Sequence, residues 1–185
     1  PISNKRSDQY GGSFENRIRF AKETIADIKS VWPESKPIFY RLSSIDAPGE
    51  GATLEDNVLL AKVLKQAGVD VIDCSSGGIT GSPVLTKSKI IPGFQVPYSE
   101  KIKKDADIST MAVGAIIDGE QANNIIANNR ADLVAMGREL LEDTQWVYKA
   151  ATHFNLKNAK DYLPDSYCFY LSRRDEFLDR TAKPA

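Results

Sequence analysis

VDVIDCS (residues 69–75) is the stretch of this sequence that decides the fold. It is a continuous β-branched run of the kind found in parallel strands that are covered on both faces. The segment before it, TLEDNVLLAKVLKQA (53–67), has a threonine cap, acidic residues in its first turn and Gly68 just past its end, and these features favour a helix. A Ser/Gly-rich loop, SSGGITGS (75–82), follows the strand. The sequence therefore predicts a helix that leads into a buried strand, as in an α/β fold.

The same pattern recurs on both sides of this unit. Helices are expected over 14–32, 53–67, 98–105, 119–129 and 138–151, and strands over 38–43, 69–75, 109–116 and 131–137. Strands that alternate with helices in this way imply right-handed crossovers and a parallel sheet.

Two architectures contain such a sheet. A doubly wound sheet would carry a phosphate loop after its first strand, G-x-G-x-x-G or G-x-x-x-x-G-K-[ST], and neither pattern occurs in this sequence. A complete (β/α)8 barrel needs about 250 residues and eight strands. Four strands in 185 residues fit the second half of a barrel. We therefore expect residues 1–151 to form half of a TIM barrel, and residues 152–185, which show no clear period, to form a C-terminal tail.

Composition excludes several classes of protein. With 42% hydrophobic residues, 26% charged residues and a formal net charge of −1, the chain can bury a core but lacks the basic clusters of a nucleic-acid or membrane-surface binder. No apolar run approaches the ~20 residues of a membrane span, and no signal peptide begins the chain. The cysteines Cys74 and Cys168 lie far apart without a histidine at ligand spacing, so neither a metal site nor a disulfide framework is expected. These features are typical of a cytoplasmic protein.

The start of the chain is unusual for a translated protein. The sequence begins at Pro1, and its two methionines, Met111 and Met136, lie deep inside it. We therefore expect the chain to be a piece of a longer protein.

Glycine and arginine follow the last two predicted strands. Parallel barrels bind ligands at the carboxyl ends of their strands, and the loops after the last two strands often hold a phosphate. Here those loops begin at Gly114 and at Gly137-Arg138. Glycine lets the backbone approach an anion, and Arg138 adds a bidentate donor. The pair Gly137-Arg138 is either a phosphate site or a turn with a surface arginine, while Gly114 alone can equally mark a close approach of neighbouring atoms.

Arg41 is a charged residue inside the first predicted strand, where apolar neighbours should bury it. A buried guanidinium needs an anion or another acceptor, so its partner is either a ligand or an acidic residue on the next strand such as Asp73. Ser75–Gly78 forms either an anion nest or a flexible loop. The single histidine, His153, ends the last predicted helix and is expected to be a surface cap. Cys74 follows a buried strand residue and is expected to be an inert hydrophobe.

Several stretches resemble a known family. SNKRSDQYGGSFENRIRF (3–20) is similar to the signature N-x-R-x-D-x-YGGS-x-ENR-x-RF of the Old Yellow Enzyme family, the flavin-dependent NAD(P)H:flavin oxidoreductases and ene-reductases. Four later stretches resemble, in the same order, the bacterial branch that includes the xenobiotic reductases: VDVIDCSSGG, PGFQVPYSEKIK, MAVGAI and ADLVAMGRELLED. The resemblance runs from about residue 2 to about residue 151.

The resemblance implies an FMN-containing (β/α)8 barrel of which this chain is the C-terminal half. It implies that Arg41 reaches the pyrimidine edge of the flavin, and that Gly114, Gly137 and Arg138 bind the FMN phosphate. It further implies NAD(P)H as co-substrate, an activated alkene or a carbonyl-conjugated compound as the small-molecule substrate, and room for a homo-oligomer. The expected reaction is hydride transfer through the flavin.

Other family features are missing from this chain. The paired His/His or His/Asn and the tyrosine proton donor of the family precede the signature at which the chain begins, so no catalytic residue is assigned and the chain alone is expected to be inactive. The segment 162–180 also differs from the short terminal segment by which family members lend an arginine to a neighbouring subunit. Two alternatives stay open: a non-catalytic FMN- or phosphate-binding half-barrel that assembles with another chain or a second copy, and a different barrel enzyme that binds a sugar phosphate.

Overall fold

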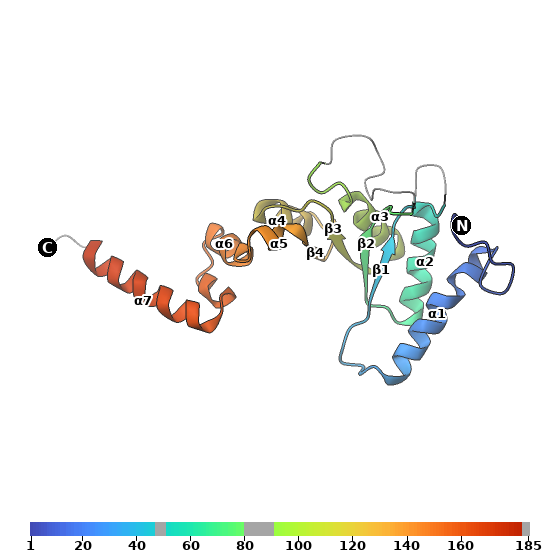
Figure 1. Cartoon of the computed structure of the whole chain (residues 1–185), viewed down its shortest axis with the longest axis horizontal. Coiled ribbons are helices and arrows are strands. Elements are labelled where there is room, and N and C mark those ends of the chain that lie inside the picture. Colours follow the sequence, from blue (N-terminus) through green and yellow to red (C-terminus); the bar gives the residue numbers. More distant parts are fainter. Residues whose placement is uncertain (47–50, 80–90, 183–185) are drawn as a thin grey trace. The chain divides into compact units, whose positions relative to one another are not determined.

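The structure is a computed structural model that describes residues 1–46, 51–79 and 91–182. The chain divides into two compact units, Pro1–Met136 and Gly137–Ala185 (Figure 1). The last part of the predicted Ser/Gly-rich loop, residues 80–82, lies outside the described residues.

Helices and strands alternate in the first unit. They are α1 (Phe14–Val31), β1 (Phe39–Ser43), α2 (Leu54–Ala67), β2 (Val71–Ser75), α3 (Val96–Ala106), β3 (Ser109–Val113), α4 (Gly119–Ala127) and β4 (Leu133–Ala135). The four strands pair in parallel in the order β1-β2-β3-β4, the same as their order in the chain. A doubly wound sheet reverses its strand order at a switch point, whereas a barrel adds each strand beside the previous one. The predicted parallel α/β fold is confirmed.

Capping residues set the helix ends, among them the threonine and the glycine predicted for the helix at 53–67. Ser13 accepts a hydrogen bond from the backbone of Asn16 at the start of α1. Thr53 and Asp56 form a reciprocal capping box at the start of α2, and Gly68 ends that helix in the left-handed conformation. These local interactions place α2 directly before β2.

One face of the sheet is covered by helices. Successive strand residues point to opposite faces, and five residues that share the first face are buried: Leu42, Ile72, Cys74, Thr110 and Ala112. Leu42, Ile72 and Cys74 belong to a core that also contains residues of α1, α2 and α3. Helix α1 packs on α2, and α2 packs on α3 (Figure 1).

The other face, here called the open face, carries Phe39, Arg41, Asp73, Met111 and Leu133. The strand register places the last four of these in one row across the sheet. Phe39 is 47% exposed and Leu133 is 42% exposed, so the described residues leave much of this face uncovered. In a closed (β/α)8 barrel the face opposite the helices lines the barrel interior. The open face is therefore the part of this chain that corresponds to a barrel interior.

Two aspartates attach the amino ends of neighbouring strands to each other. Asp70, just before β2, accepts a hydrogen bond of 2.7 Å from the backbone N–H of Ile38. Asp132, just before β4, accepts one of 2.9 Å from the backbone N–H of Thr110. The same type of hydrogen bond thus connects β1 to β2 and β3 to β4. Both bonds lie at the amino ends of the strands, away from the predicted site.

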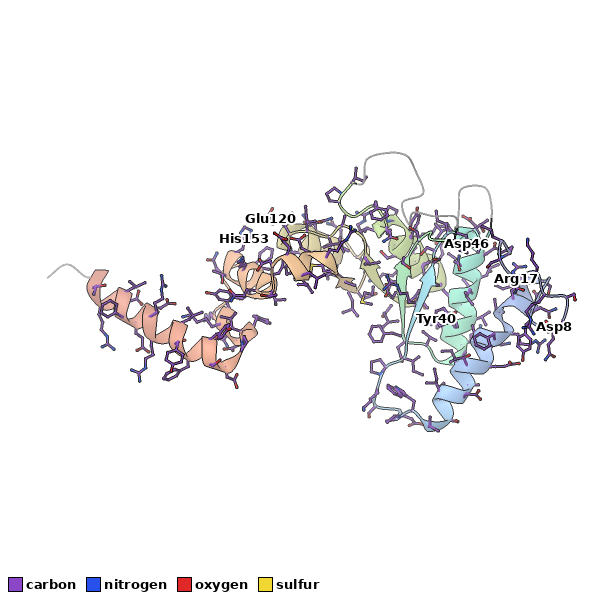
Figure 2. All side chains as sticks on the ribbon, in the orientation of Figure 1. Asp8, Arg17, Tyr40, Asp46, Glu120 and His153 are labelled. Atoms are coloured by element: carbon purple, nitrogen blue, oxygen red, sulfur yellow. The ribbon has the colours of Figure 1, made fainter. Side chains whose placement is uncertain are left out.

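The second unit differs from the sequence prediction. The helix expected over 138–151 is two helices, α5 (Arg138–Glu142) and α6 (Trp146–His153), since Asp143 is extended and its side chain accepts a hydrogen bond from the backbone of Gln145. His153 ends α6 and is exposed, as predicted (Figure 2). The region predicted to be an irregular tail contains a 3-10 helix, Ala159–Tyr162, and a long helix, α7 (Asp165–Ala182).

The sequence of α7 shows no clear helical spacing of apolar residues because only one narrow stripe of the helix is shielded from solvent. Its partly buried positions are Cys168, Leu171, Ser172 and Asp175, which follow helical spacing but include two polar side chains. Large exposed side chains such as Tyr170 and Phe177 occupy other positions and obscure that spacing. Among the described residues no helix is long and apolar enough to cross a membrane.

Candidate functional site

The signature segment 3–20 is held together by its own hydrogen bonds. The side-chain amide of Asn4 donates to the carbonyl oxygen of Tyr10 at 2.8 Å. The side-chain amide of Asn16 donates to the carbonyl oxygen of Gly11 at 3.0 Å. The polar residues that carry the family resemblance therefore stabilise the turn that leads into α1, which is a structural role.

Arg41 lies in the middle of β1, directly opposite Asp73 of β2. The Nη1 atom of Arg41 is 3.5 Å from the Oδ2 atom of Asp73, so the acidic partner considered for Arg41 is present. The Arg41 side chain is 64% exposed, which corrects the expectation that apolar neighbours bury it. The cause is its position on the open face, where its neighbours in the row lie beside it on other strands and leave the guanidinium uncovered.

Asp73 is the buried member of this pair. Its side chain is 10% exposed, and its Oδ1 atom makes no hydrogen bond within the described residues. Burial raises the pKa of Asp73, and the Arg41 guanidinium opposes that rise. A buried acceptor without a hydrogen-bond partner costs free energy. The neighbouring Arg41 guanidinium has five N–H donors. The exposed guanidinium can donate hydrogen bonds to the carbonyl oxygens of a planar ring edge.

Gly114 immediately follows β3 and has a φ of +115°. A Cβ atom at this position would lie 2.6 Å from Nε2 of Gln95 and 3.1 Å from Cε1 of Phe94. The backbone N–H of Gly93 donates to the carbonyl oxygens of both Gly114 and Ala115, each at 3.0 Å. The close approach considered from the sequence is therefore present, and the turn after β3 is held in one conformation.

Gln95 is a residue that sequence reasoning missed. Its side chain is buried and contacts the ends of two strands: the Ser76 hydroxyl donates to its Oε1 at 2.7 Å, and its Nε2 donates to the carbonyl oxygen of Val113 at 3.2 Å. Its place in the family-like stretch PGFQVPYSEKIK was the only available signal. Ser76, predicted to belong to an anion nest or a flexible loop, is thus tied to the end of β3.

Gly137 and Arg138 begin the second unit, two to three positions after the end of β4 at Ala135. Gly137 is the N-cap of α5, and a Cβ atom built on it would meet no other atom within 4 Å. Arg138 is exposed, and its guanidinium makes no hydrogen bond or ion pair within the described part of the chain. These residues offer an open glycine backbone and an unpaired cation. The structure thus places Arg41 and Gly114 on one sheet and describes Gly137 and Arg138 separately.

A cavity of about 540 Å³ opens at the opposite, amino ends of β3 and β4, beside Ser109 and Asp132. Its lining includes the ion pair of Lys103 and Asp132, whose nitrogen and oxygen are 2.7 Å apart. Parallel α/β proteins bind their ligands at the carboxyl ends of the strands. The residues around Arg41 and Gly114 are therefore the better candidate site.

A sheet of parallel strands in sequence order, with cationic and glycine positions toward its carboxyl ends, is characteristic of (β/α)8-barrel enzymes. The chain belongs to the NADH:flavin oxidoreductase / NADH oxidase family, whose sequence profile it matches over residues 1–157. The predicted family is confirmed, and the family name implies a flavin cofactor. Helix α7 lies beyond the matched residues.

Two curated relatives define the extent of the match. The chain is 45% identical over 155 residues to an NADPH dehydrogenase of Bacillus subtilis (strain 168), covering 84% of this chain and 44% of that protein. It is 48% identical over 151 residues to an NADPH dehydrogenase of Geobacillus sp. (strain WCH70), covering 82% of this chain and 43% of the relative. The chain thus spans less than half the length of these relatives.

Solved structures agree with a partial barrel. A 2-naphthoyl-CoA reductase in complex with 2-naphthoyl-CoA superposes with a TM-score of 0.71 at 25% identity, over 82% of this chain and 23% of that one. Histamine dehydrogenase from Rhizobium sp. 4-9 superposes with a TM-score of 0.64 at 20% identity, over 87% of this chain and 23% of that one, which supports the fold alone. The predicted half of a TIM barrel is confirmed.

Proposed function

We propose that this chain provides the FMN-holding half of a flavin-dependent NAD(P)H oxidoreductase that reduces electron-poor alkenes. The observation that carries the proposal is the Arg41–Asp73 pair on the open face of a sheet that belongs to a flavin oxidoreductase family. The chemistry supplied by bound FMN is the acceptance of a hydride from NAD(P)H and its transfer to the β-carbon of an alkene conjugated to a carbonyl. The names of the relatives favour NADPH as the donor.

Arg41 acts in this proposal at the pyrimidine edge of the flavin. A guanidinium there stabilises the negative charge that the ring gains on reduction. Asp73 holds the guanidinium on the open face through their ion pair. The exposed Arg41 guanidinium therefore fits a flavin, whose pyrimidine edge carries carbonyl oxygens.

Gly114, Gly137 and Arg138 bind the phosphate in this proposal. Gly114 directly follows β3, three residues beyond Met111, which is in the same row as Arg41. Standard strand spacings then separate the Cα atoms of Arg41 and Gly114 by roughly 14 Å. An extended ribityl phosphate attached to a three-ring system can cover such a span. Arg138 adds a bidentate cationic contact to the phosphate oxygens.

The proposal is tested by titrating the chain with FMN and with riboflavin, which lacks the phosphate, and by following flavin fluorescence. Charge-assisted contacts to a phosphate contribute about 1.5–3 kcal/mol each, so FMN is expected to bind at least about tenfold more tightly than riboflavin. Equal affinity for the two flavins would contradict the proposal.

The chain with saturating FMN is expected to oxidise NADPH no faster than free FMN does. The reason is that the resemblance assigns the substrate ligands and the proton donor of the family to residues that precede the signature at 3–20, so this chain does not supply them. The measurement is the decrease in NADPH absorbance with and without an activated enone such as cyclohexenone. Turnover at ordinary enzymatic rates of 1 s⁻¹ or more, by the order of magnitude typical of enzymes, would show that the chain is catalytically complete.

A second candidate function is a non-catalytic FMN-binding half-barrel that a second copy completes. The exposure of Phe39 on β1 and Leu133 on β4, the two edge strands, favours it. This candidate predicts that the chain sediments as a dimer and that Leu133→Lys shifts it toward the monomer. A wild-type monomer across the micromolar range would count against it.

A further inference from the structure

Gln95 occupies the N-cap position of α3 but does not cap that helix. Its residue is only 5% exposed, and its amide is directed to other segments. A side-chain cap typically contributes about 1 kcal/mol to a helix, and α3 lacks one. The amide instead accepts a hydrogen bond from Ser76, in the loop after β2, and donates one to the carbonyl oxygen of Val113, at the end of β3.

The same amide defines the space around Gly114. Its Nε2 atom lies 2.6 Å from where a Cβ of residue 114 would be, so the glycine and the amide each depend on the position of the other. Gly93, two residues before Gln95, donates its backbone N–H to the carbonyl oxygens of Gly114 and Ala115. The segment that begins α3 therefore contacts the turn after β3 through backbone and side chain together.

Only an amide can make both side-chain contacts. Oε1 must accept from the Ser76 hydroxyl while Nε2 donates to a carbonyl oxygen. A glutamate would place a carboxylate oxygen against the Val113 carbonyl and add a negative charge beside the turn that carries Gly114. An asparagine has one methylene fewer and cannot span the same two partners.

We propose that Gln95 is a positioning residue, which joins the loop after β2 to the turn after β3 and fixes the Gly114 backbone in the orientation that phosphate binding requires. The inference rests on the proposed function, because Gly114 is assigned there to the FMN phosphate. Gln95 acts through Gly114 and Ser76 and does not itself touch the cofactor.

The test compares Gln95→Leu, Gln95→Glu and Ser76→Ala in the full 185-residue chain. Ser99→Ala is the matched control, because Ser99 also lies on α3, is fully buried, and loses a comparable hydrogen bond, to the carbonyl oxygen of Arg130. Two quantities are measured for each variant: the ratio of FMN affinity to riboflavin affinity, and hydrogen exchange of the backbone amides over 75–78 and 113–117.

Gln95→Leu is expected to lower the FMN-to-riboflavin affinity ratio about tenfold, as the loss of a buried hydrogen bond predicts, and to speed exchange in both segments at once. Gln95→Glu is expected to lower the ratio further. Ser76→Ala combined with Gln95→Leu should add little to either single change, since the two residues share one hydrogen bond. Ser99→Ala should leave the ratio and both segments unchanged.

Three outcomes are distinguishable. If the wild-type chain binds FMN and riboflavin equally, the proposed function fails, and the positioning role fails with it. If the wild type prefers FMN but Gln95→Leu keeps that preference, the inference about Gln95 alone is overturned. If Gln95→Leu speeds exchange in only one of the two segments, the claimed connection between the loops is overturned whatever the flavin data show.

Discussion

Replacing Gly114 by alanine is expected to lower the free energy of unfolding of the first unit by about 3 kcal/mol. Two costs add at this position. The φ of +115° is unfavourable for any residue with a Cβ, and that Cβ would lie 2.6 Å from Nε2 of Gln95. Gln95 cannot swing aside without breaking its hydrogen bonds to Ser76 and Val113.

Alanine substitutions at two other glycines distinguish the cost of backbone strain from the cost of the Cβ contact. Gly12 has a φ of +79° with nothing within 4 Å of its missing Cβ, so alanine there should cost only the backbone strain of about 1 kcal/mol. Gly137 has a φ of −111° and equally open surroundings, so alanine there should change stability by less than about 0.5 kcal/mol. The expected order of destabilisation is Gly114, then Gly12, then Gly137.

The measurement is urea unfolding followed by thiol labelling of Cys74 in a Cys168→Ser background. Cys74 is fully buried in the first unit, and burial raises the pKa of its thiol to about 12, so it reacts only when that unit opens. Circular dichroism serves for Gly137→Ala, which lies in the second unit. Equal losses for Gly114→Ala and Gly12→Ala would contradict the contact between Gly114 and Gln95.

Replacing Asp73 by asparagine is expected to stabilise the chain at neutral pH, by about 1 kcal/mol, because a neutral amide is less costly to bury than a carboxylate that leaves one oxygen without a hydrogen bond. Burial raises the pKa of Asp73 in the folded chain above its usual value. The native state therefore binds that proton more tightly than the unfolded state does. The stability that this carboxyl contributes is full below its unfolded pKa and is lost as the pH rises through the folded pKa.

The advantage of Asp73→Asn should accordingly grow as the pH rises from about 4 and be absent at lower pH. Asp107→Asn is a control of opposite sign, because the Lys65 ammonium lowers the pKa of Asp107. That variant should lose stability above its folded pKa, where the wild-type carboxylate is charged. The melting temperature of each variant is measured across pH 3–8. An Asp73→Asn chain that is less stable than wild type at pH 7 would show that the carboxylate is structurally required.

The arrangement of the sheet could be predicted from the sequence because the strand pattern, the helix caps and the order of the elements all indicate the same fold. The run at 69–75, the capping box of α2 and the glycine after it are local signals, and together they leave few topologies for a parallel sheet. The predicted strand over 109–116 is shorter in the structure and ends at Val113. The reason is that Gly114 and Ala115 both take positive φ, which a strand cannot continue through.

The candidate site was only partly accessible in this way. The exposure of Arg41 depends on what covers the open face, and the composition of a single strand does not report that. The role of Gln95 depends on two partners that lie 19 and 18 residues away in the sequence. Long-range contacts of this kind leave no local period, so a buried amide at a helix start looks like an ordinary surface residue.

Under the proposed function, Arg41 binds the ring of the flavin and Arg138 binds its phosphate. The most direct measurement titrates wild type, Arg41→Met, Arg138→Met and the control Arg130→Met, whose wild-type arginine is paired with Glu100, with FMN and riboflavin. The account predicts that Arg138→Met weakens FMN binding about tenfold or more and leaves riboflavin binding unchanged. We expect Arg41→Met to weaken the binding of both ligands by one common factor and Arg130→Met to leave both affinities unchanged. Weaker binding of FMN but not of riboflavin in Arg41→Met, or unchanged FMN binding in Arg138→Met, would contradict this assignment of the two arginines.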